Sequence, residues 1–372
     1  MVKKAIKSKI IDGTYSPNQK ISSESELMKE FGVSRHTVRL AIGDLVIAGW
    51  LYREQGSGTF CADRSTMNAN KSQSHQKNIA IITTYISDYI FPSIIRGAES
   101  WLSEKGYQIS IFSTNNNLDK ERQILENILT QRFDGIIVEP TKSADSNPNI
   151  HYYLNLEHLS IPYIMINAYY DELEPVSIVM DDEKGGYLQT EHLIKFGHQN
   201  IVGCFKTDDT QGIKRMKGFL KAHRQNNVKV NPSNIITYTT EEKFTKPVKD
   251  LERLLSTKNN SITGIICYND ELALKFINVL RPKNIRVPED ISIVGFDDSH
   301  LAEVSETKLT TVKHPKSEMG KAAADTILKL IDTGLKKGNK GKEAYNAESI
   351  VYTPKIVERN STKEIDDSKI NS

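Results

Sequence analysis

The 372-residue sequence lacks any run of about 18 apolar residues, the length that a membrane-spanning helix requires. Its basic first residues, Met-Val-Lys-Lys-Ala-Ile-Lys-Ser-Lys, also lack the apolar core of a secretory signal peptide. We therefore expect a cytoplasmic protein that makes no contact with a membrane. A chain of this length is more typical of two or more compact units than of one domain.

Cysteine is scarce as well. Cys61, Cys204 and Cys267 are far apart in the sequence, form no C-x-x-C pair, and each lies in or beside an apolar run. Buried, reduced thiols are the expected state, because this spacing suits neither a metal site nor a catalytic nucleophile. The histidines are scattered without the spacing of metal ligands, so we expect no metal site.

Motifs of the common enzyme classes are missing too. The sequence contains no nucleophile elbow, no H-E-x-x-H pair and no Walker loop. The run Gly338-Asn-Lys-Gly-Lys follows an expected helix rather than a buried strand, so it does not have the context of a phosphate-binding loop. We expect no catalytic residues and no cofactor.

What the sequence does contain is an uneven distribution of charge. The net charge is only +2, but residues 1–66 hold ten Lys and Arg residues against seven Asp and Glu residues. The remaining 306 residues therefore carry a net charge of −1. A positive excess confined to a short N-terminal segment favours a module that contacts the phosphates of a nucleic acid.

The composition also indicates where the chain divides. Residues 67–78 contain almost no large apolar side chain, so burial cannot offset the entropy of ordering them and we expect an exposed linker. It separates a short first domain, residues 1–66, from a long second domain, residues 79–357. Residues 358–372 are polar, and we expect a frayed tail there.

In the second domain, short apolar runs alternate with amphipathic stretches. The expected strands are Ile79–Tyr85, Gln108–Thr114, Gly135–Glu139, Tyr163–Asn167, Ile201–Phe205, Gly264–Tyr268 and Ser292–Phe296. The expected helices include Phe91–Lys105, Asp119–Gln131, Glu183–Phe196 and Asp270–Val279. This α/β alternation predicts parallel sheets flanked by helices. Because nearly 280 residues exceed what one such sheet usually needs, two lobes are expected.

The first domain contains the pattern of a helix-turn-helix. Ser23 and Glu26 have the S-x-x-E spacing of a capping box, and the helix that they begin ends at Gly32. Ser34 then caps a second helix, on which Arg35 and Arg39 share a face. Two helices joined by so tight a turn are typical of DNA readers, and arginine side chains suit guanine edges or phosphates. The alternative is a solvated charged face.

A hairpin is expected next, with strands Trp50–Arg53 and Thr59–Cys61 around Glu54-Gln55-Gly56-Ser57-Gly58. The glycines permit a tight tip, whose backbone N–H groups and Gln55 could reach the minor groove or phosphates. Taken alone, such a hairpin would be only structural.

The run Phe31-Gly-Val-Ser-Arg-His-Thr-Val-Arg39, with Leu45, Gly49 and Gly56-Ser-Gly-Thr-Phe60, resembles the GntR family of winged-helix regulators. The resemblance implies a winged helix-turn-helix that binds DNA. Members usually have a few more residues before the first helix, so we expect that helix to be short here. The candidate DNA-binding residues are Ser34, Arg35, His36, Thr37, Arg39, Gln55, Gly56 and Ser57.

Polar side chains follow the expected strands of the second domain, at the sheet edge where two-lobed α/β proteins bind ligands. Their carboxylates and amides could bind hydroxyl groups, and an aromatic side chain could cover a sugar C–H face. Asp297 and Asn269 could instead only cap helices, and Phe91 could belong to the core. The candidate ligand-binding residues are Asp88, Tyr89, Phe91, Glu139, Thr141, Lys142, Asn167, Lys206, Asp209, Gln211, Arg215, Asn269, Asp297 and His314.

Six runs in this domain resemble the sensor domain of the LacI/GalR family, which is similar to periplasmic sugar-binding proteins. They are Asp181-Asp-Glu-Lys-Gly-Gly186, Phe196-Gly-His-Gln-Asn-Ile201, Arg215-Met-Lys-Gly-Phe219, Tyr268-Asn-Asp-Glu-Leu-Ala273, Val294-Gly-Phe-Asp-Asp298 and Leu309-Thr-Thr-Val-Lys-His314. The resemblance implies effector contacts at Phe91, Thr141, Asn167, Asp209, Gln211, Arg215, Asn269, Asp297 and His314.

The chain as a whole resembles arabinose-responsive repressors that join these two domains. That resemblance rests on Thr83-Thr-Tyr-Ile-Ser-Asp-Tyr-Ile-Phe91, Ser113-Thr-Asn-Asn-Asn117, Val138-Glu-Pro-Thr-Lys-Ser143 and Asp209-Thr-Gln-Gly212. It implies L-arabinose as the inducer and operators of arabinose-utilisation genes as the DNA partner. Spacing and composition alone indicate only a small polar ligand.

We therefore expect a homodimeric repressor whose winged domains occupy two operator half-sites. Sugar binding would close the two lobes and favour a dimer geometry that fits the operator poorly. Two alternatives remain open. The same architecture could respond to another sugar or a sugar phosphate, or the chain could be a sugar-binding or transport protein without a role on DNA.

Overall fold

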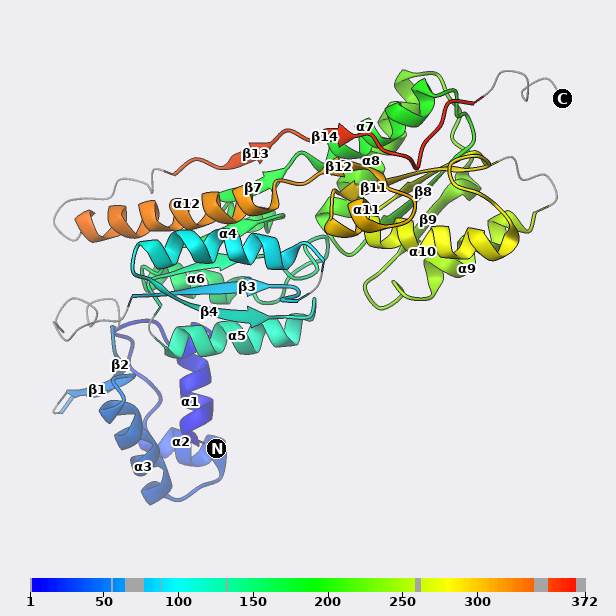
Figure 1. Cartoon of the computed structure of the whole chain (residues 1–372). Coiled ribbons are helices and arrows are strands. Elements are labelled where there is room, and N and C mark those ends of the chain that lie inside the picture. The colour runs from blue at the N-terminus through cyan, green and yellow to red at the C-terminus, as the bar shows by residue number, and fades with distance from the viewer. Residues whose placement is uncertain are drawn as a thin grey trace.

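The computed structural model describes residues 2–54, 56–63, 77–87, 89–131, 133–257, 262–337 and 347–365. Figure 1 shows a small N-terminal part, shown in dark blue, beside two larger α/β lobes. In the described residues, no helix combines the length and the apolar character that crossing a membrane would demand. The fold class is the expected one, a winged helix-turn-helix joined to a two-lobed α/β domain.

The N-terminal part, the winged part below, consists of α1 (Val2–Ile11), α2 (Glu24–Phe31), α3 (Arg35–Ile47), β1 (Leu51–Glu54) and β2 (Gly58–Cys61). The predicted capping box is present, with the Glu26 amide bonded to the Ser23 hydroxyl and the Glu26 carboxylate bonded to the Ser23 amide. Gly32 adopts a φ of 60°, which a glycine accepts without steric cost, so α3 can begin three residues later, after its N-cap Ser34.

Lobe 1 is built on a six-stranded sheet in the order β13-β7-β6-β5-β3-β4, and its strand pairs are all parallel. Helices α4 and α12 pack on one face, and α5 and α6 pack on the other. Its strands are β3 (Asn78–Thr83), β4 (Gln108–Ser113), β5 (Gly135–Val138), β6 (Tyr163–Ile166), β7 (Ser177–Met180) and β13 (Ile350–Tyr352). Its helices are α4 (Phe91–Glu104), α5 (Leu118–Thr130), α6 (Ile150–His158), α12 (Lys316–Lys337) and a 3-10 turn at Asp171–Leu173.

Lobe 2 has a second six-stranded sheet, β14-β12-β11-β10-β8-β9, in which only the edge strand β14 is antiparallel. Helices α7 and α8 cover one face, and α9 and α10 the other. Its strands are β8 (Ile201–Lys206), β9 (Ile235–Tyr238), β10 (Gly264–Cys267), β11 (Ser292–Asp297), β12 (Thr310–Lys313) and β14 (Lys355–Val357). Its helices are α7 (Asp182–Lys195), α8 (Thr210–Gln225), α9 (Lys246–Leu255), α10 (Asp270–Leu280) and α11 (His300–Val304), with 3-10 turns at Pro232–Asn234 and Arg281–Lys283.

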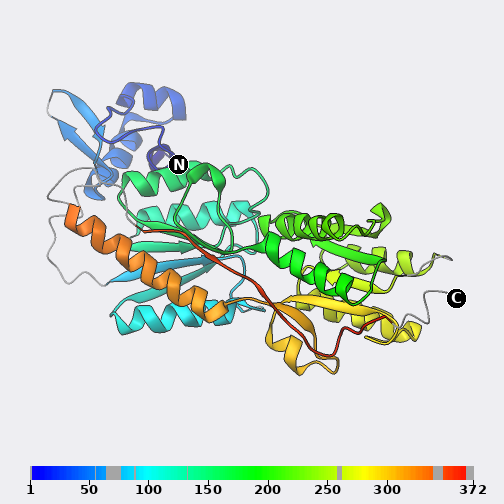
Figure 2. The same cartoon turned by 90° about the horizontal axis from the view of Figure 1, so that it is seen from above.

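The chain crosses between the lobes three times, after β7, after β12 and after β13 (Figure 2). Lobe 1 thus contains α12 and β13 from the C-terminal part of the chain. The crossovers leave the carboxyl ends of strands from both sheets facing one another, which is where binding sites of such folds form.

The structure extends and corrects the sequence-based prediction. The expected strands and helices are confirmed to within two residues. The expected lists for the second domain did not contain helices α6, α8, α9, α11 and α12 or strands β7, β9, β12, β13 and β14. These strands have only three or four residues, so their apolar patterns are brief. Residues 67–76 of the expected linker lie outside the described residues, and Asn78 is already part of β3.

The tail expected to fray after Val357 is tied to lobe 2 as far as Ile365. The Ser361 hydroxyl is fully buried and bonded to the Ile293 carbonyl, and Arg359 forms an ion pair with Asp298 at 2.7 Å. The amide of Ile365 bonds to the Phe196 carbonyl at 2.8 Å. A polar segment is ordered here by hydrogen bonds to β11 and β12 and not by apolar burial.

Close packing of α4 against α12 generates the first prediction. A Cβ at Gly320 of α12 would overlap the carbonyl oxygen of Ile94 in α4. Gly320→Ala should therefore push the helices apart and lower the free energy of unfolding by about 1–3 kcal/mol, measured by chemical denaturation. Ser100→Ala, at an exposed position of α4, is the control and should change it by less than about 0.5 kcal/mol. Equal stability of the two variants would contradict this packing.

Candidate functional site

The first candidate site is the exposed start of α3. Ser34 accepts the Thr37 amide at 3.2 Å and so caps the helix, while Arg35, His36 and Thr37 are exposed. The Arg39 Nε lies 2.9 Å from a Glu24 carboxylate oxygen of α2, and the Arg35 Nε lies 4.0 Å from it. Both guanidinium groups remain more than half exposed. The structure thus places five of the predicted DNA-binding residues on one accessible turn.

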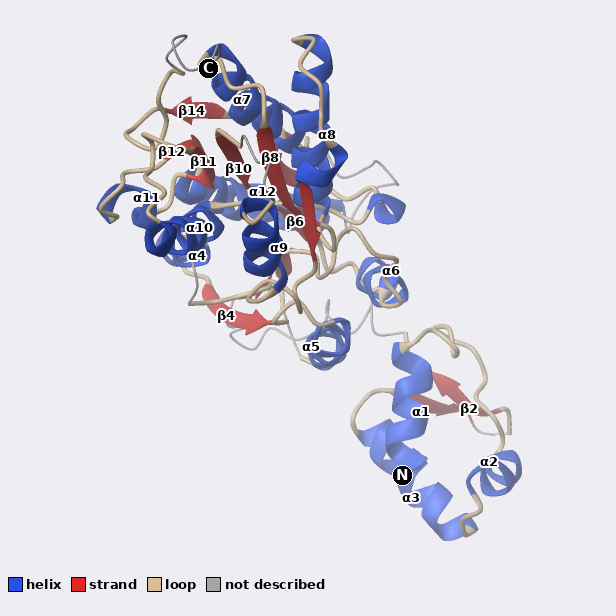
Figure 3. Ribbon diagram, turned by 90° about the vertical axis from the view of Figure 1, so that its right-hand side faces the viewer, coloured by secondary structure: helices blue, strands red, loops and turns tan. Residues whose placement is uncertain are grey.

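The remaining predicted DNA-binding residues belong to the hairpin. Gly56 has a φ of 81° and Ser57 follows it, both exposed at the tip between β1 and β2. The Ser57 amide bonds to the Glu54 carbonyl at 3.1 Å, which closes the turn. Gln55 lies outside the described residues. Helices α2 and α3 lie on the side of the winged part away from lobe 1 (Figure 3).

The second candidate site is a cleft of about 560 Å³ between the two lobes. It is lined by eleven of the predicted ligand-binding residues: Tyr89, Phe91, Glu139, Asn167, Lys206, Asp209, Gln211, Arg215, Asn269, Asp297 and His314. Their positions at strand ends follow from the parallel sheets, whose carboxyl ends converge on the cleft.

Three other predicted residues are not among those that line the cleft. Asp88 lies outside the described residues. Thr141 is buried, and its hydroxyl bonds to that of Thr114 at 3.1 Å. The Lys142 ammonium instead pairs with Glu241 of lobe 2 at 2.7 Å, and the backbone of Lys142 has a left-handed φ of 44°. The expectation that ligand-binding residues follow the strands located the loop after β5 correctly. It did not predict which side chains of that loop face the cleft.

Arg215 is the centre of the buried charges in the cleft. Its Nε donates to Asp182 at 2.8 Å and its Nη1 donates to the Tyr268 carbonyl at 2.7 Å. The guanidinium also lies 3.5 Å from the centre of the Phe296 ring. A Cβ at Gly186 would overlap the Arg215 carbonyl, so this glycine lets α7 approach α8 closely enough for the Asp182 contact.

Burial raises the pKa of Asp182 to about 6, although the positive charge of Arg215 opposes the rise. Burial also raises the pKa of Asp297, again against the attraction of Arg215. The Asp297 carboxylate lies 3.8 Å from the Arg215 Nη2, which is too long for a hydrogen bond. Arg215 therefore holds Asp182 firmly and leaves Asp297 within reach of a ligand.

A chain of hydrogen bonds runs through the lobe 1 side of the cleft. Glu139 accepts the amide and hydroxyl of Thr84 at 2.8 and 2.6 Å and the Asn167 amide group at 2.9 Å. The Asn167 carbonyl oxygen lies 3.2 Å from the His314 Nε2. Burial lowers the pKa of His314 to about 3, so its ring is neutral. With Nε2 as the donor to Asn167, the His314 Nδ1 becomes an acceptor.

Three buried acceptors of the cleft have no hydrogen-bond partner within the described residues. They are Asp297 Oδ1, Gln211 Oε1 and His314 Nδ1. Unsatisfied buried acceptors are costly, and a ligand that supplies hydroxyl donors would remove that cost. The arrangement therefore suits a polyhydroxylated molecule.

Other predicted residues have structural partners as well. Asp209 caps α8 by accepting the Gly212 amide at 2.7 Å, and it also binds Lys206 at 2.9 Å and the Tyr268 hydroxyl at 2.7 Å. Asn269 caps α10, as one of the sequence-based alternatives proposed. Burial opposes the charge on Lys206, but Asp209 and Asp208 outweigh it and hold the pKa of Lys206 above its ordinary value.

Aromatic residues lie at the cleft in two roles. The Tyr89 hydroxyl donates to the Phe296 carbonyl at 2.8 Å and accepts the Asp270 amide at 3.0 Å, so it joins the lobes. Phe91 lines the cleft and also belongs to the lobe 1 core, where it lies 5.9 Å from the Tyr85 ring. Both interpretations of Phe91 are therefore compatible with the structure.

Sequence reasoning missed several lining residues, among them Thr84, Tyr85, Asn116, Asp182, Tyr238, Lys243, Phe244, Tyr268, Glu271 and Lys275. Asp182 was quoted within a motif but follows a strand that was not predicted. The Asn116 side-chain amide donates across the cleft to the Thr240 hydroxyl at 2.6 Å. The two residues are 124 positions apart, so no local sequence pattern predicts this contact. The run Tyr268-Asn-Asp-Glu directly follows β10. Its place after a strand could have predicted that Tyr268 and Glu271 line the cleft.

Two family models match this chain. The model described as bacterial regulatory proteins, gntR family, matches residues 1–61, and the model described as a periplasmic binding protein-like domain matches residues 190–362. The first match covers the winged part, and the second covers most of lobe 2 and the return into lobe 1.

Curated relatives match nearly the whole chain. An arabinose metabolism transcriptional repressor of Halalkalibacterium halodurans is 59% identical over 99% of this chain and 97% of its own length. One of Geobacillus stearothermophilus is 48% identical over 98% and 97%. An HTH-type transcriptional repressor PurR of Aliivibrio fischeri is 29% identical over 68% of this chain and 74% of its own.

Solved structures share the fold of the two lobes. The transcription regulator CcpA of Lactococcus lactis has a TM-score of 0.65 and 23% identity, and it covers 78% of this chain and 100% of its own. A LacI family regulator from Enterococcus faecium with bound ribose has a TM-score of 0.63 and 24% identity over the same shares. At these identities the likeness is one of fold.

The buried carboxylate of Asp270 should make the stability of the protein depend on pH. It accepts the Thr311 hydroxyl at 2.6 Å and the Ser299 amide at 2.8 Å, and burial together with the charge of Asp297 raises its pKa to about 7. The folded protein therefore binds this proton more tightly than the unfolded chain does. The free energy of unfolding should fall as pH rises from about 4 to about 7, on the order of 1.4 kcal/mol per unit of raised pKa.

Asp270→Asn removes this titration, so its stability relative to the unaltered protein should increase across the same pH range, measured by urea denaturation. The exposed Asp119→Asn is the matched control, and it should leave the pH profile unchanged. Parallel profiles for Asp270→Asn and the unaltered protein would show that Asp270 does not titrate in this way.

Proposed function

Since the chain belongs to the family of arabinose metabolism transcriptional repressors, we propose that L-arabinose binds between the two lobes and releases the winged part from operator DNA. Members of this family are regulators of transcription and not enzymes. A single observation carries the proposal: three buried acceptors have no hydrogen-bond partner among the described residues. They are Asp297 Oδ1, Gln211 Oε1 and His314 Nδ1. A neutral pentose can donate hydroxyl hydrogens to all three.

The charges of the cleft favour a neutral sugar over a sugar phosphate. The carboxylates that line the cleft and are buried are those of Glu139, Asp182, Asp209 and Asp297. Arg215 is buried and the Lys206 side chain is 12% exposed, and both already pair with carboxylates. An additional phosphate would meet excess negative charge in a site of low dielectric, which costs free energy. Lys243 and Lys275 line the cleft as well, but Lys275 pairs with Glu271.

The proposed operator complex is a homodimer in the cytoplasm, with one winged part in each half-site. The start of α3 would enter the major groove, where Arg35 and Arg39 can reach guanine edges or phosphates. Gly56 of the hairpin would meet an adjacent phosphate through its backbone N–H group, and Ser57 would do so through its hydroxyl, because the Ser57 amide already bonds to the Glu54 carbonyl. The exposure of all four residues supports these roles.

L-arabinose can release the operator only if it binds one arrangement of the lobes more tightly than the other. The two lobes in this structure contact each other across the cleft through Tyr89, Asn116, Lys142 and Ser143 of lobe 1. Acceptors from both lobes then face one ligand volume. We propose that this closed arrangement is the sugar-bound one, and that an open arrangement binds the operator.

The DNA contacts lead to a prediction. Arg35→Ala or Arg39→Ala should raise the operator Kd by about tenfold or more, because each arginine contact is worth about 1–3 kcal/mol. The slope of log K against log salt should also become shallower by about one for each lost phosphate contact. Fluorescence anisotropy with labelled operator measures both quantities.

The matched control for these variants is Arg281→Ala, which removes an equally exposed arginine from lobe 2. It should leave the operator Kd unchanged within about twofold. L-arabinose affinity should be unaltered in all three variants. Tight operator binding by the Arg35→Ala and Arg39→Ala variants would contradict the assignment of α3 as the reader.

The cleft leads to another prediction. In calorimetric titrations, L-arabinose should bind more tightly than xylose, ribose, galactose and arabinose 5-phosphate. Asp297→Asn should raise the L-arabinose Kd by about 10- to 100-fold, because a hydrogen bond to a charged group is worth about 1.5–3 kcal/mol. Asp325→Asn, on α12 away from the cleft, is the control. An absence of heat with L-arabinose would refute the proposed effector.

A further inference from the structure

The winged part is docked directly on lobe 1. The Asn155 side chain of α6 donates a hydrogen bond to the carbonyl of Ile11, the last residue of α1. Two residues after Ile11, a Cβ at Gly13 would lie 3.6 Å from the Asn155 Oδ1, so the turn after α1 is also in contact. The carbonyls at the end of a helix have no partner within it, and Asn155 supplies one.

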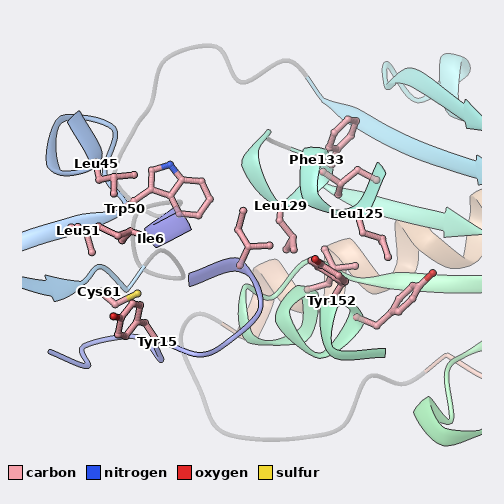
Figure 4. Close-up of a cluster of buried hydrophobic side chains, with 14 of the residues drawn as sticks. Ile6, Tyr15, Leu45, Trp50, Leu51, Cys61, Leu125, Leu129, Phe133 and Tyr152 are labelled. Atoms are coloured by element: carbon pink, nitrogen blue, oxygen red, sulfur yellow. The ribbon is translucent and has the colours of Figure 1, made fainter. Parts of the chain in front are cut away.

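Apolar packing accompanies this hydrogen bond. Buried side chains of the winged part and of lobe 1 form one continuous cluster, which contains Ile6 and Ile11 on one side and Leu129 and Tyr152 on the other. Figure 4 shows Ile6, Trp50 and Leu51 of the winged part on one side of this boundary and Leu129 and Tyr152 of lobe 1 on the other. The contact is therefore built from both apolar burial and a specific polar bond.

The same helix α6 is connected to the ligand cleft. The loop between β5 and α6 begins with Glu139 and Pro140, which line the cleft. The next residue, Thr141, donates its amide to the Tyr170 hydroxyl at 2.8 Å. That hydroxyl lies 2.7 Å from a carboxylate oxygen of Glu121.

Glu121 is fully buried and holds the start of α6 in place. Its carboxylate accepts the side-chain amides of Asn147 and Asn149 at 3.0 and 2.8 Å, and Asn149 is the residue before the helix. It also accepts the Tyr153 hydroxyl, from the first turns of α6, at 2.8 Å. Breaking any one of these hydrogen bonds would leave part of a buried carboxylate unsatisfied, which costs free energy. We therefore expect the loop and α6 to move together.

We propose that the α6 face of lobe 1 is the docking surface for the chain's own winged part, and that it carries the effector signal to the DNA reader. Lobe closure displaces the Glu139–Asn149 loop, Glu121 transmits that displacement to α6, and α6 reorients α1 through Asn155. This inference rests on the proposed function, since it requires that L-arabinose changes operator affinity.

The decisive quantity is the coupling ratio, the operator Kd with saturating L-arabinose divided by the operator Kd without it. Couplings between sites are typically about 5- to 150-fold. In Asn155→Ala the ratio should fall to below about threefold, while the L-arabinose Kd in the absence of DNA stays within about twofold of the unaltered protein. Leu154→Ala, at an exposed position of the same helix, is the control and should keep the full ratio.

An unchanged ratio in Asn155→Ala would overturn the docking proposal. A ratio of one in the unaltered protein would instead refute the proposed function, so the two failures are distinguishable. Hydrogen exchange of the unaltered protein gives a second measurement that needs no variant. Without DNA, L-arabinose should change the protection of amides in both α6 and the last turn of α1, and unchanged protection in these helices would also overturn the proposal.

Discussion

The cleft depends on one buried guanidinium. Arg215 can lie there only because Asp182, the Tyr268 carbonyl and the Phe296 ring surround it, since an unpaired buried charge would cost several kcal/mol. These partners come from α7 and from the ends of β10 and β11, so one side chain fixes three elements of lobe 2. Gly186 permits the close approach of α7 to α8, and this approach brings Asp182 within hydrogen-bond distance of Arg215.

The two sides of the cleft differ in how their polar groups are satisfied. On the lobe 1 side the polar groups already have partners: Glu139 is bonded to Thr84 and Asn167, and the Asn167 carbonyl oxygen lies 3.2 Å from the His314 Nε2. Lobe 2 presents Asp297 and Gln211 with unpaired oxygens, and His314 lies at a crossover between the lobes. A ligand that bonds to all of these groups would hold the crossover and lobe 2 against the hydrogen-bonded groups of lobe 1.

The sequence predicted well whatever depends on local chemistry. Ser23, Glu26 and Gly32 define the helix-turn-helix through caps and a positive φ, and apolar strands predict where cleft residues follow. Contacts between distant elements were not predictable in this way. Lys142 was assigned to the ligand but pairs with Glu241 of the other lobe, and the role of Asp182 depends on the packing of α7 on α8. Asn155 carried no signal, because its partner is a backbone carbonyl 144 residues away.

The ion pair between Glu24 and Arg39 bears on how the proposed DNA-binding helix α3 would distinguish its operator from other DNA. In the proposed DNA complex, the Glu24 carboxylate beside Arg35 and Arg39 would weaken their attraction for any phosphate backbone and so reduce binding to random DNA. At a correct site, base-edge contacts can draw the guanidinium away from Glu24 and recover that loss. On this proposal the ion pair would lower the overall affinity for DNA and raise the ratio of operator binding to non-specific binding.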